Sequence, residues 1–253
     1  VLGPNPAVGL VSMTFVSAGG VLAEDESTNG LGTLMAAVAT KGAGELSAEQ
    51  IAEFFDAAGG YVSGNCGSNT FYWQASVLDD RFDRAVDIFA DVVQHPTFPA
   101  DELERLRPRA VAAAQQVDEQ VLSEAQRFFR RTFYEGSPYR LLPVGRQEVL
   151  QSATTEQLAA WHRRHVRAGS SVLAGYGNFD AAEARRHIAE GFADLPPGEA
   201  ALPAPPRRAM PAGNETFVKR TSKQVSAVFV GAAGMKRTNV ADWAAIDGLD
   251  TII

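Results

Sequence analysis

The chain has 253 residues, of which 45% are hydrophobic and 21% are charged, and its 30 acidic and 23 basic side chains give a net charge of −7. This length and composition are typical of a folded chain with one large domain or two smaller ones. The acidic balance argues against a nucleic-acid partner, no apolar run approaches the roughly 18 residues of a membrane span, and the single cysteine excludes both an internal disulfide and a cysteine-based zinc site.

The first half of the chain predicts an alternation of strands and helices. Residues 7–16 alternate imperfectly and indicate a strand. Leu31, Leu34, Met35 and Val38 fall at i, i+3, i+4 and i+7, which predicts one face of a helix. The same signals predict further elements in chain order: a helix opened by a Ser47/Gln50 capping box, strands at 61–63 and 70–78, and a helix over 82–93 that stops near Pro96.

The second half predicts mainly helices. Two are expected, around 103–117 and 121–134, with Pro108 kinking or splitting the first. A helix over 154–166 and a strand over 170–176 follow, and then a helix that Asp180 and Glu183 cap.

A Pro-rich stretch at residues 195–206 predicts a semi-rigid linker between a first domain, 1–194, and a second, 207–253. The second resembles the start of the first, because residues 12–20 match 226–234 at a constant offset of 214. That offset also places the apolar helix face on Ala245, Gly248, Leu249 and Ile252. The pattern predicts one full repeat and the opening of another, which would have to lean on the first copy or on residues outside this sequence.

Five segments spread over most of the chain carry a family resemblance. Residues 29–42 resemble a zinc helix that follows Gly-Leu and precedes Lys-Gly, and residues 47–60 resemble the glycine-ended helix after it. Residues 77–96, 133–139 and 161–180 resemble later passages in the same order. The family is that of the pitrilysin/insulinase peptidases, the inverzincins. The resemblance implies an α+β fold in which helices back an antiparallel sheet.

The zinc-binding positions of that family are changed here. Active members carry His-x-x-Glu-His on this helix and a glutamate ligand on a later one. The corresponding positions are Thr33, Ala36 and Ala37, and the register of the third ligand falls near Ala113. A catalytic zinc needs three protein ligands and an open position for water. The resemblance therefore implies a member with no metal, no cofactor and no catalytic residues of its own.

The resemblance also places residues 63–67 beside the groove where an extended substrate adds as a strand. Ser63, Gly64, Asn65, Cys66 and Gly67 are small enough to let a peptide backbone approach closely. A Gly-rich turn between two strands explains the same residues. Because no histidine lies near Cys66 in sequence, a nucleophilic role for this thiol is disfavoured.

The histidines do not indicate a metal site. His162 and His165 have the spacing of a helical pair, but arginines flank them and no carboxylate lies nearby, so the pattern favours a basic surface helix. His187 follows Arg185 and Arg186, which likewise indicates a polar helix face. His95 precedes a proline at the expected end of a helix, where an imidazolium interacts well with the helix dipole.

These observations lead to a functional hypothesis. We expect a catalytically inactive homologue that pairs with a zinc-bearing peptidase subunit or half, encloses an extended peptide substrate, and neither binds nucleic acid nor inserts into a membrane. The alternative is a purely structural subunit, like the core proteins of the respiratory cytochrome complex, and a hydrolase with an unrecognised site is a third possibility. The compartment stays open between the bacterial periplasm and the cytoplasm.

Overall fold

The computed structural model describes residues 1–200, 202–203, 213–222 and 224–232. Its centre is a five-stranded sheet with the order β1-β7-β2-β6-β5. The strands are β1 (Leu2–Pro4), β2 (Leu10–Ala18), β5 (Tyr61–Cys66), β6 (Thr70–Leu78) and β7 (Ser171–Gly177), with β3 (Gly42–Ala43) and β4 (Leu46–Ser47) in a separate pair. All neighbouring strands of the large sheet are antiparallel except β1 and β7, which run parallel. The expected antiparallel sheet is confirmed, and the short strand β1 adds one parallel pairing at its edge.

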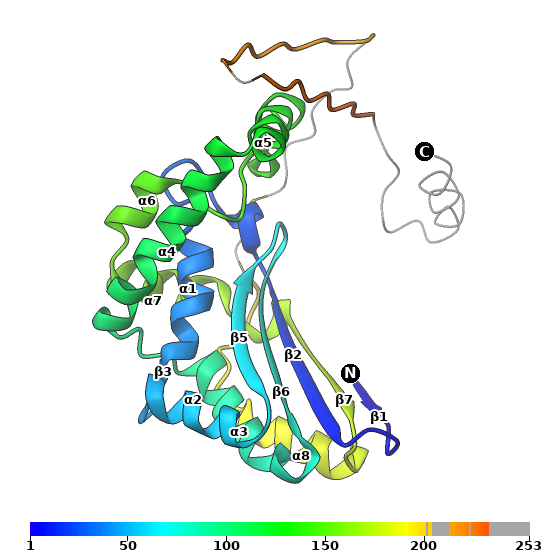
Figure 1. The fold of residues 1–253 in the computed structure, drawn as a ribbon. Coiled ribbons are helices and arrows are strands. Elements are labelled where there is room, and N and C mark those ends of the chain that lie inside the picture. Colours follow the sequence, from blue (N-terminus) through cyan, green and yellow to red (C-terminus); the bar gives the residue numbers. More distant parts are fainter. Residues whose placement is uncertain (201, 204–212, 223, 233–253) are drawn as a thin grey trace.

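Helices back one face of this sheet (Figure 1). The helices are α1 (Leu31–Val38), α2 (Ala48–Ala57), α3 (Phe82–Gln94), α4 (Ala100–Glu119), α5 (Val121–Phe133), α6 (Gln147–Ser152), α7 (Thr155–His165) and α8 (Ala181–Gly191). Short 3-10 turns lie between them: η1 (Gly20–Ala23), η2 (Ala39–Lys41), η3 (Asp79–Arg81), η4 (Pro138–Arg140) and η5 (Ala168–Ser170).

Strict alternation in β2 and β6 explains why the sheet has one covered face. Odd-numbered residues such as Met13, Phe15 and Trp73 are at most 2% exposed and point into the core beneath the helices. Even-numbered residues of the same strands are half-buried or exposed on the opposite face. The apolar faces of α1 and α3 meet the core side, so one hydrophobic core joins the helices to the sheet.

Local signals in the sequence are mostly confirmed. Ser47 and Gln50 form the expected capping box of α2, and the Asp180 side chain accepts bonds from the first amides of α8. Pro108 does not split its helix, because α4 runs without a break from Ala100 to Glu119. Proline on the exposed side of a long helix removes one hydrogen bond, and the packing of the neighbouring turns outweighs that loss.

The segment after the Pro-rich stretch is described only in part. Residues 213–222 and 224–232 contain no helix or strand, so residues 226–232 do not form the strand that the internal similarity predicts. A strand needs a hydrogen-bonding neighbour, and the described part of the chain supplies none here. The segment instead lies beside α5 (Figure 1). Lys219 pairs there with Glu124, and Phe229 stacks on Phe129. The expected helix face at 245–252 lies outside the described residues, and the two-domain division stays a prediction.

No helix in the described ranges is both long enough and apolar enough to cross a membrane.

Candidate functional site

Helix α1 carries three of the four positions where the resemblance places zinc chemistry. Its apolar stripe of Leu31, Leu34, Met35 and Val38 is at most 5% exposed. The helix lies against β5, α4 and α7. Its first residue follows Gly30, which has a left-handed φ of 114° and offers no capping side chain. The free amides at the start of α1 therefore need an acceptor from elsewhere.

Glu24 supplies that acceptor. Its carboxylate accepts hydrogen bonds from the amides of Gly30 (3.2 Å) and Gly32 (2.9 Å) and from Nδ2 of Asn29 (2.8 Å). Asn29 also donates to the carbonyl of Leu142 at 2.9 Å, which ties the loop after η4 to the same point. Glu24 is only 3% exposed, and this burial raises its pKa to about 7 although the three bonds favour the charged form.

The side chains at the degenerate positions serve the scaffold. The Thr33 hydroxyl donates to the carbonyl of Pro143. The Ala36 methyl is fully buried, and its carbonyl accepts a bond of 3.1 Å from Nε1 of Trp73. Ala37 is half-buried, and its carbonyl accepts from the Thr40 hydroxyl at 2.9 Å. None of these side chains is an imidazole or a carboxylate, so the residues present do not fit a zinc ion.

The fourth position lies on α4. Its buried and half-buried residues form a stripe that includes Leu103, Ala110, Ala114 and Val117. Ala113 is exposed, whereas Ala114 is 4% exposed and belongs to the same core as α1. On this turn of α4, a zinc-binding side chain would therefore have to stand at position 114, and not at position 113, to point toward α1. Across the part of the chain that the structure describes, no three His, Cys, Asp or Glu side chains come together as a metal site.

The predicted peptide-binding residues lie at the sheet edge beside α1. Ser63 to Cys66 are in β5, which pairs only with β6 in this sheet, and Gly67 begins the turn to β6. The carbonyls of Gly67, Ser68 and Asn69 accept bonds from the amides of Val21, Leu22 and Gly19. The turn is therefore already occupied by η1, while the other long edge of β5 has no strand neighbour among the residues that the structure describes.

The hydrogen-bond alternation identifies which β5 groups face that open edge. Gly67 pairs with Thr70, and in an antiparallel ladder every second residue then points to the neighbouring strand. Tyr61, Ser63 and Asn65 thus bond to β6. The backbone N–H and C=O groups of Val62, Gly64 and Cys66 point away from it.

The geometry gives Gly64 a different role from the one its size first indicates. A Cβ at Gly64 would lie 1.9 Å from the carbonyl oxygen of Ala36. Position 64 therefore needs a glycine because α1 rests directly on it, and close approach of a peptide is not required to explain its small size.

Cys66 is not a nucleophile in this setting. Burial, together with the nearby charge of Glu24, raises the pKa of its thiol well above the ordinary value. The thiolate is the reactive form, so the thiol is inert near neutral pH.

The histidine pair is not on a surface helix, as the flanking arginines had suggested. His162 is 6% exposed and His165 is 1% exposed. Nε2 of His162 bonds to the carbonyl of Val93 at 2.8 Å, and His165 packs on the Trp161 ring. Burial lowers the pKa of both imidazoles from 6.5 to about 4. The other two histidines have structural partners: His95 closes α3 and contacts Asp194, and His187 contacts Asp87.

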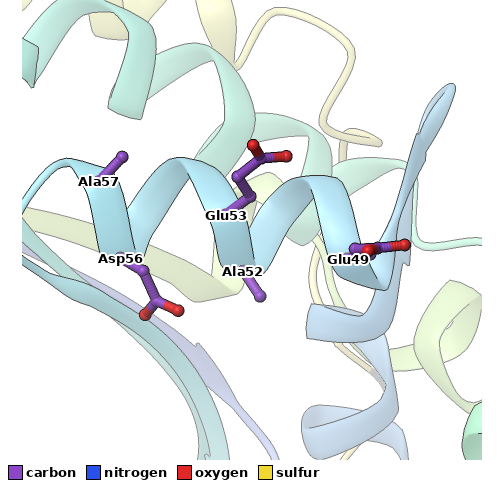
Figure 2. A pocket seen from close by; sticks show the side chains of 5 residues that line it. All are labelled: Glu49, Ala52, Glu53, Asp56 and Ala57. Carbon is purple, nitrogen blue, oxygen red and sulfur yellow. The ribbon is translucent and has the colours of Figure 1, made fainter.

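A shallow hollow with three carboxylates in its lining lies on α2. Glu49, Ala52, Glu53, Asp56 and Ala57 line it. Figure 2 shows the carboxylate of Glu53 on one side of the helix and that of Asp56 on the other. Carboxylates that diverge in this way cannot coordinate one cation.

The raised pKa of Glu24 predicts how the stability of the fold depends on pH. A folded-state pKa of about 7, above the ordinary 4.5, stabilises the fold fully below pH 4.5, and this contribution is lost as the pH rises through 7. It amounts to about 3 kcal/mol. His162 and His165 act in the opposite sense, because their lowered pKa values stabilise the fold above pH 6.5 and lose that effect as the pH falls toward 4.

We expect Glu24→Gln to remove the loss of stability that the ionisation of Glu24 causes as the pH rises. The gain in unfolding free energy between pH 4.5 and 7, measured by urea denaturation, should then be larger than in the wild type by about 3 kcal/mol. Glu53→Gln removes an exposed carboxylate and is the matched control. Equal pH dependence in wild type and Glu24→Gln would contradict the assignment.

Comparisons with known proteins show which family this chain resembles over most of its length. The family model described as Insulinase (Peptidase family M16) matches residues 7–141, and the model described as Peptidase M16 inactive domain matches residues 152–253. A zinc protease of Rickettsia felis is 25% identical over 226 residues, which are 88% of this chain and 53% of that protein. The probable mitochondrial-processing peptidase subunit beta of Arabidopsis thaliana is 23% identical over 68% of this chain and 32% of its own length.

The fold is also found among solved structures. The crystal structure of a peptidase M16 inactive domain from Pseudomonas fluorescens superposes with a TM-score of 0.73 at 24% identity, over 81% of this chain and 50% of that one. The chain spans about half the length of the first two curated relatives it matches.

Proposed function

The chain belongs to the insulinase family of peptidases, peptidase family M16, and from that premise we propose that it is a non-catalytic member that pairs with a zinc-bearing subunit or half and forms part of a closed peptide-binding chamber. The observation that carries the proposal is the chemistry at Thr33, Ala36, Ala37 and Ala114, where α1 and α4 present only a hydroxyl and methyl groups. Each of these residues is engaged in packing or in a hydrogen bond of the scaffold.

Preservation of the surrounding scaffold supports a binding role. Glu24 holds the start of α1, Trp73 holds its middle through the Ala36 carbonyl, and Thr33 ties it to the loop at Pro143. These contacts keep α1 against β5 without any metal. The edge beside the former zinc helix therefore stays in place although the residues for catalysis are gone.

A peptide is the ligand that this edge suits. The outward N–H and C=O groups of Val62, Gly64 and Cys66 offer main-chain hydrogen bonds to an extended segment, and such bonds need no particular side chain in the ligand. In this proposal the chain positions the peptide and excludes water, and the partner supplies zinc and the reacting groups.

The test is a cleavage assay with a zinc-bearing member of the family from the same organism. We expect no hydrolysis by this chain alone, even with added zinc, and a kcat/KM for the mixture about tenfold or more above that of the partner alone, equivalent to ~1.4 kcal/mol. Val62→Pro removes an outward amide and leaves the β6 ladder intact, so this variant should fold and stimulate less. Equal cleavage with and without this chain would exclude the assisting role and favour a purely structural subunit.

A further inference from the structure

Residues 195–200 form the first half of the Pro-rich stretch, and they are hydrogen-bonded to η5. The carbonyl of Pro196 accepts a bond of 2.9 Å from the amide of Ala168. The carbonyl of Gly198 accepts one of 2.8 Å from the amide of Gly169. A stretch of this composition is expected to act as a spacer, but here it lies against the preceding fold. We call residues 195–200 the docked segment.

Both ends of the docked segment are held as well. Leu195 packs against the hydrophobic core at the start of the segment. At its other end the amide of Ala200 donates to the side-chain oxygen of Ser170 at 2.7 Å. Because the segment is tied at both ends and in the middle, it cannot swing away about either end while these contacts last.

Two glycines allow this close contact. A Cβ at Gly169 would lie 2.6 Å from the carbonyl oxygen of Gly198 and 3.1 Å from its carbonyl carbon. Gly169 does not have a positive φ, so this contact, and not its backbone conformation, calls for glycine. Gly198 has a φ of 94°, which favours glycine, and Pro197 before it has a φ fixed by its ring. The segment is therefore preorganised for the path that it takes.

The surface that receives the docked segment is itself fixed to the fold. Turn η5 lies between α7 and β7. The Ser17 hydroxyl of β2 donates to the carbonyl of His165 at 3.0 Å, and Ser17 also pairs with Ser171 in the sheet. The Ser171 hydroxyl donates to the carbonyl of Arg167 at 2.7 Å. These bonds hold both sides of η5, so a segment bound to it is bound to a rigid part of the molecule.

The family comparison supports a structural link between η5 and the chain beyond the docked segment. The model described as Peptidase M16 inactive domain matches residues 152–253 in one piece. That match includes α7, η5, β7, α8, the docked segment and the predicted second domain. The elements that receive the segment and the chain that leaves it are therefore parts of one family unit.

We propose that the docked segment holds the chain to η5 as far as Ala200, so that the connection to the predicted second domain begins after this residue and not at Leu195. Withdrawing residues 195–200 from the connection removes roughly 20 Å of reach, at about 3.3 Å per extended residue. The segment thereby limits how far the predicted second domain can lie from the first. This inference goes beyond the proposed function and does not depend on it, because it concerns the isolated chain.

Hydrogen exchange of single amides in the 253-residue chain tests the proposal. We expect the amides of Ala168, Gly169 and Ala200 to exchange at least about tenfold more slowly than in an unstructured peptide, because each is bonded in the docked arrangement. In Gly169→Ala the new methyl group meets the Gly198 carbonyl, and protection of all three amides should fall by about tenfold. The loss at Ala200 is the informative one, because the substitution does not touch its own bond.

Two further variants make the result specific. Gly9→Ala is the matched control, since its Cβ would have no neighbour within 4 Å, and it should leave the three amides protected. Ser170→Ala adds no bulk and removes only the acceptor for Ala200. It should release Ala200 and leave Ala168 and Gly169 protected. Circular dichroism spectra confirm that the variants are folded.

A protease that cuts after glutamate gives an independent measurement. Glu199 is exposed but lies between the bonded residues Gly198 and Ala200, and a protease needs several free, extended residues around the bond that it cuts. Cleavage after Glu199 should therefore be about tenfold faster in Gly169→Ala than in the wild type or Gly9→Ala, since its rate follows the population of the open form.

The opposite results overturn the proposal. An unprotected Ala200 amide in the wild type would show that the chain leaves the fold before this residue. Equal exchange and equal cleavage in the wild type and Gly169→Ala would show that the contact with η5 does not hold the segment. Unchanged protection of Ala200 in Ser170→Ala would remove the bond on which the end point of the docked segment depends.

Discussion

The triple substitution Thr33→His, Ala37→His and Ala114→Glu is expected to create a zinc site in this chain, with a Kd of about 1 µM or tighter, equivalent to ~8 kcal/mol of binding free energy. Thr33 and Ala37 are one helical turn apart on the half-buried side of α1. Ala114 lies on the buried side of α4, which packs against α1. Two imidazoles and a carboxylate are a ligand set that zinc accepts, with water in the fourth position.

The scaffold offers support for the new ligands. The carbonyl of Pro143, which accepts from the Thr33 hydroxyl, is available as an acceptor for the second ring nitrogen of a histidine at that position. Metal-binding histidines commonly donate to such a group, which fixes their orientation. The remaining contacts of α1 with Glu24 and Trp73 are untouched by the three substitutions.

Zinc content after dialysis and competition with a chelator measure the site. The control is Thr33→His and Ala37→His combined with Ala113→Glu, which moves the carboxylate one residue onto the exposed side of α4. This control should bind zinc at least about tenfold more weakly, since two ligands alone do not complete the site. Tighter binding by the Ala113→Glu combination would show that α4 is turned differently, and no binding by either would show that α1 and α4 no longer hold the family's spacing.

The elements with strong periodicity could be predicted from the sequence. The stripe of α1 and the alternation of β6 each place apolar side chains on one face, and burial of that face determines the element. Strand β1 could not be found this way, because its three residues gain stability from parallel pairing with β7, about 170 residues later in the chain. Such a pairing leaves no local pattern.

The functional residues divide in the same way. The absence of zinc ligands at Thr33, Ala36 and Ala37 could be read directly, whereas the face of α4 that carries the fourth position required the structure. The burial of His162 and His165 had a signal, since both continue the apolar spacing set by Leu158 and Trp161, but the neighbouring arginines obscured it. Glu24 was missed because a carboxylate that caps a helix from a distant loop has no fixed spacing; the start of α1 at Gly30, without a capping side chain, was the available clue.

Replacing Gly64 by alanine should destabilise the protein by about 4 kcal/mol, above the common range for overpacking, because the new methyl group meets backbone and not a flexible side chain. The added Cβ would lie 1.9 Å from the carbonyl oxygen of Ala36 and 2.8 Å from Cδ1 of Trp73. To admit it, α1 must move off β5, and that movement breaks the bond from Trp73 to the Ala36 carbonyl. Both groups would then be buried without a partner, which adds to the loss.

Urea denaturation of Gly64→Ala measures the change, and the near-ultraviolet circular dichroism of the tryptophans reports whether Trp73 has lost its fixed environment. Gly67→Ala is the matched control three residues along the same segment, because its Cβ would approach nothing closer than 3.5 Å. That variant should cost less than about 1 kcal/mol. If Gly64→Ala were as stable as Gly67→Ala, α1 would not rest on β5 as described. The small residues of this edge would then be explained better by the approach of a peptide backbone than by the packing of the former zinc helix.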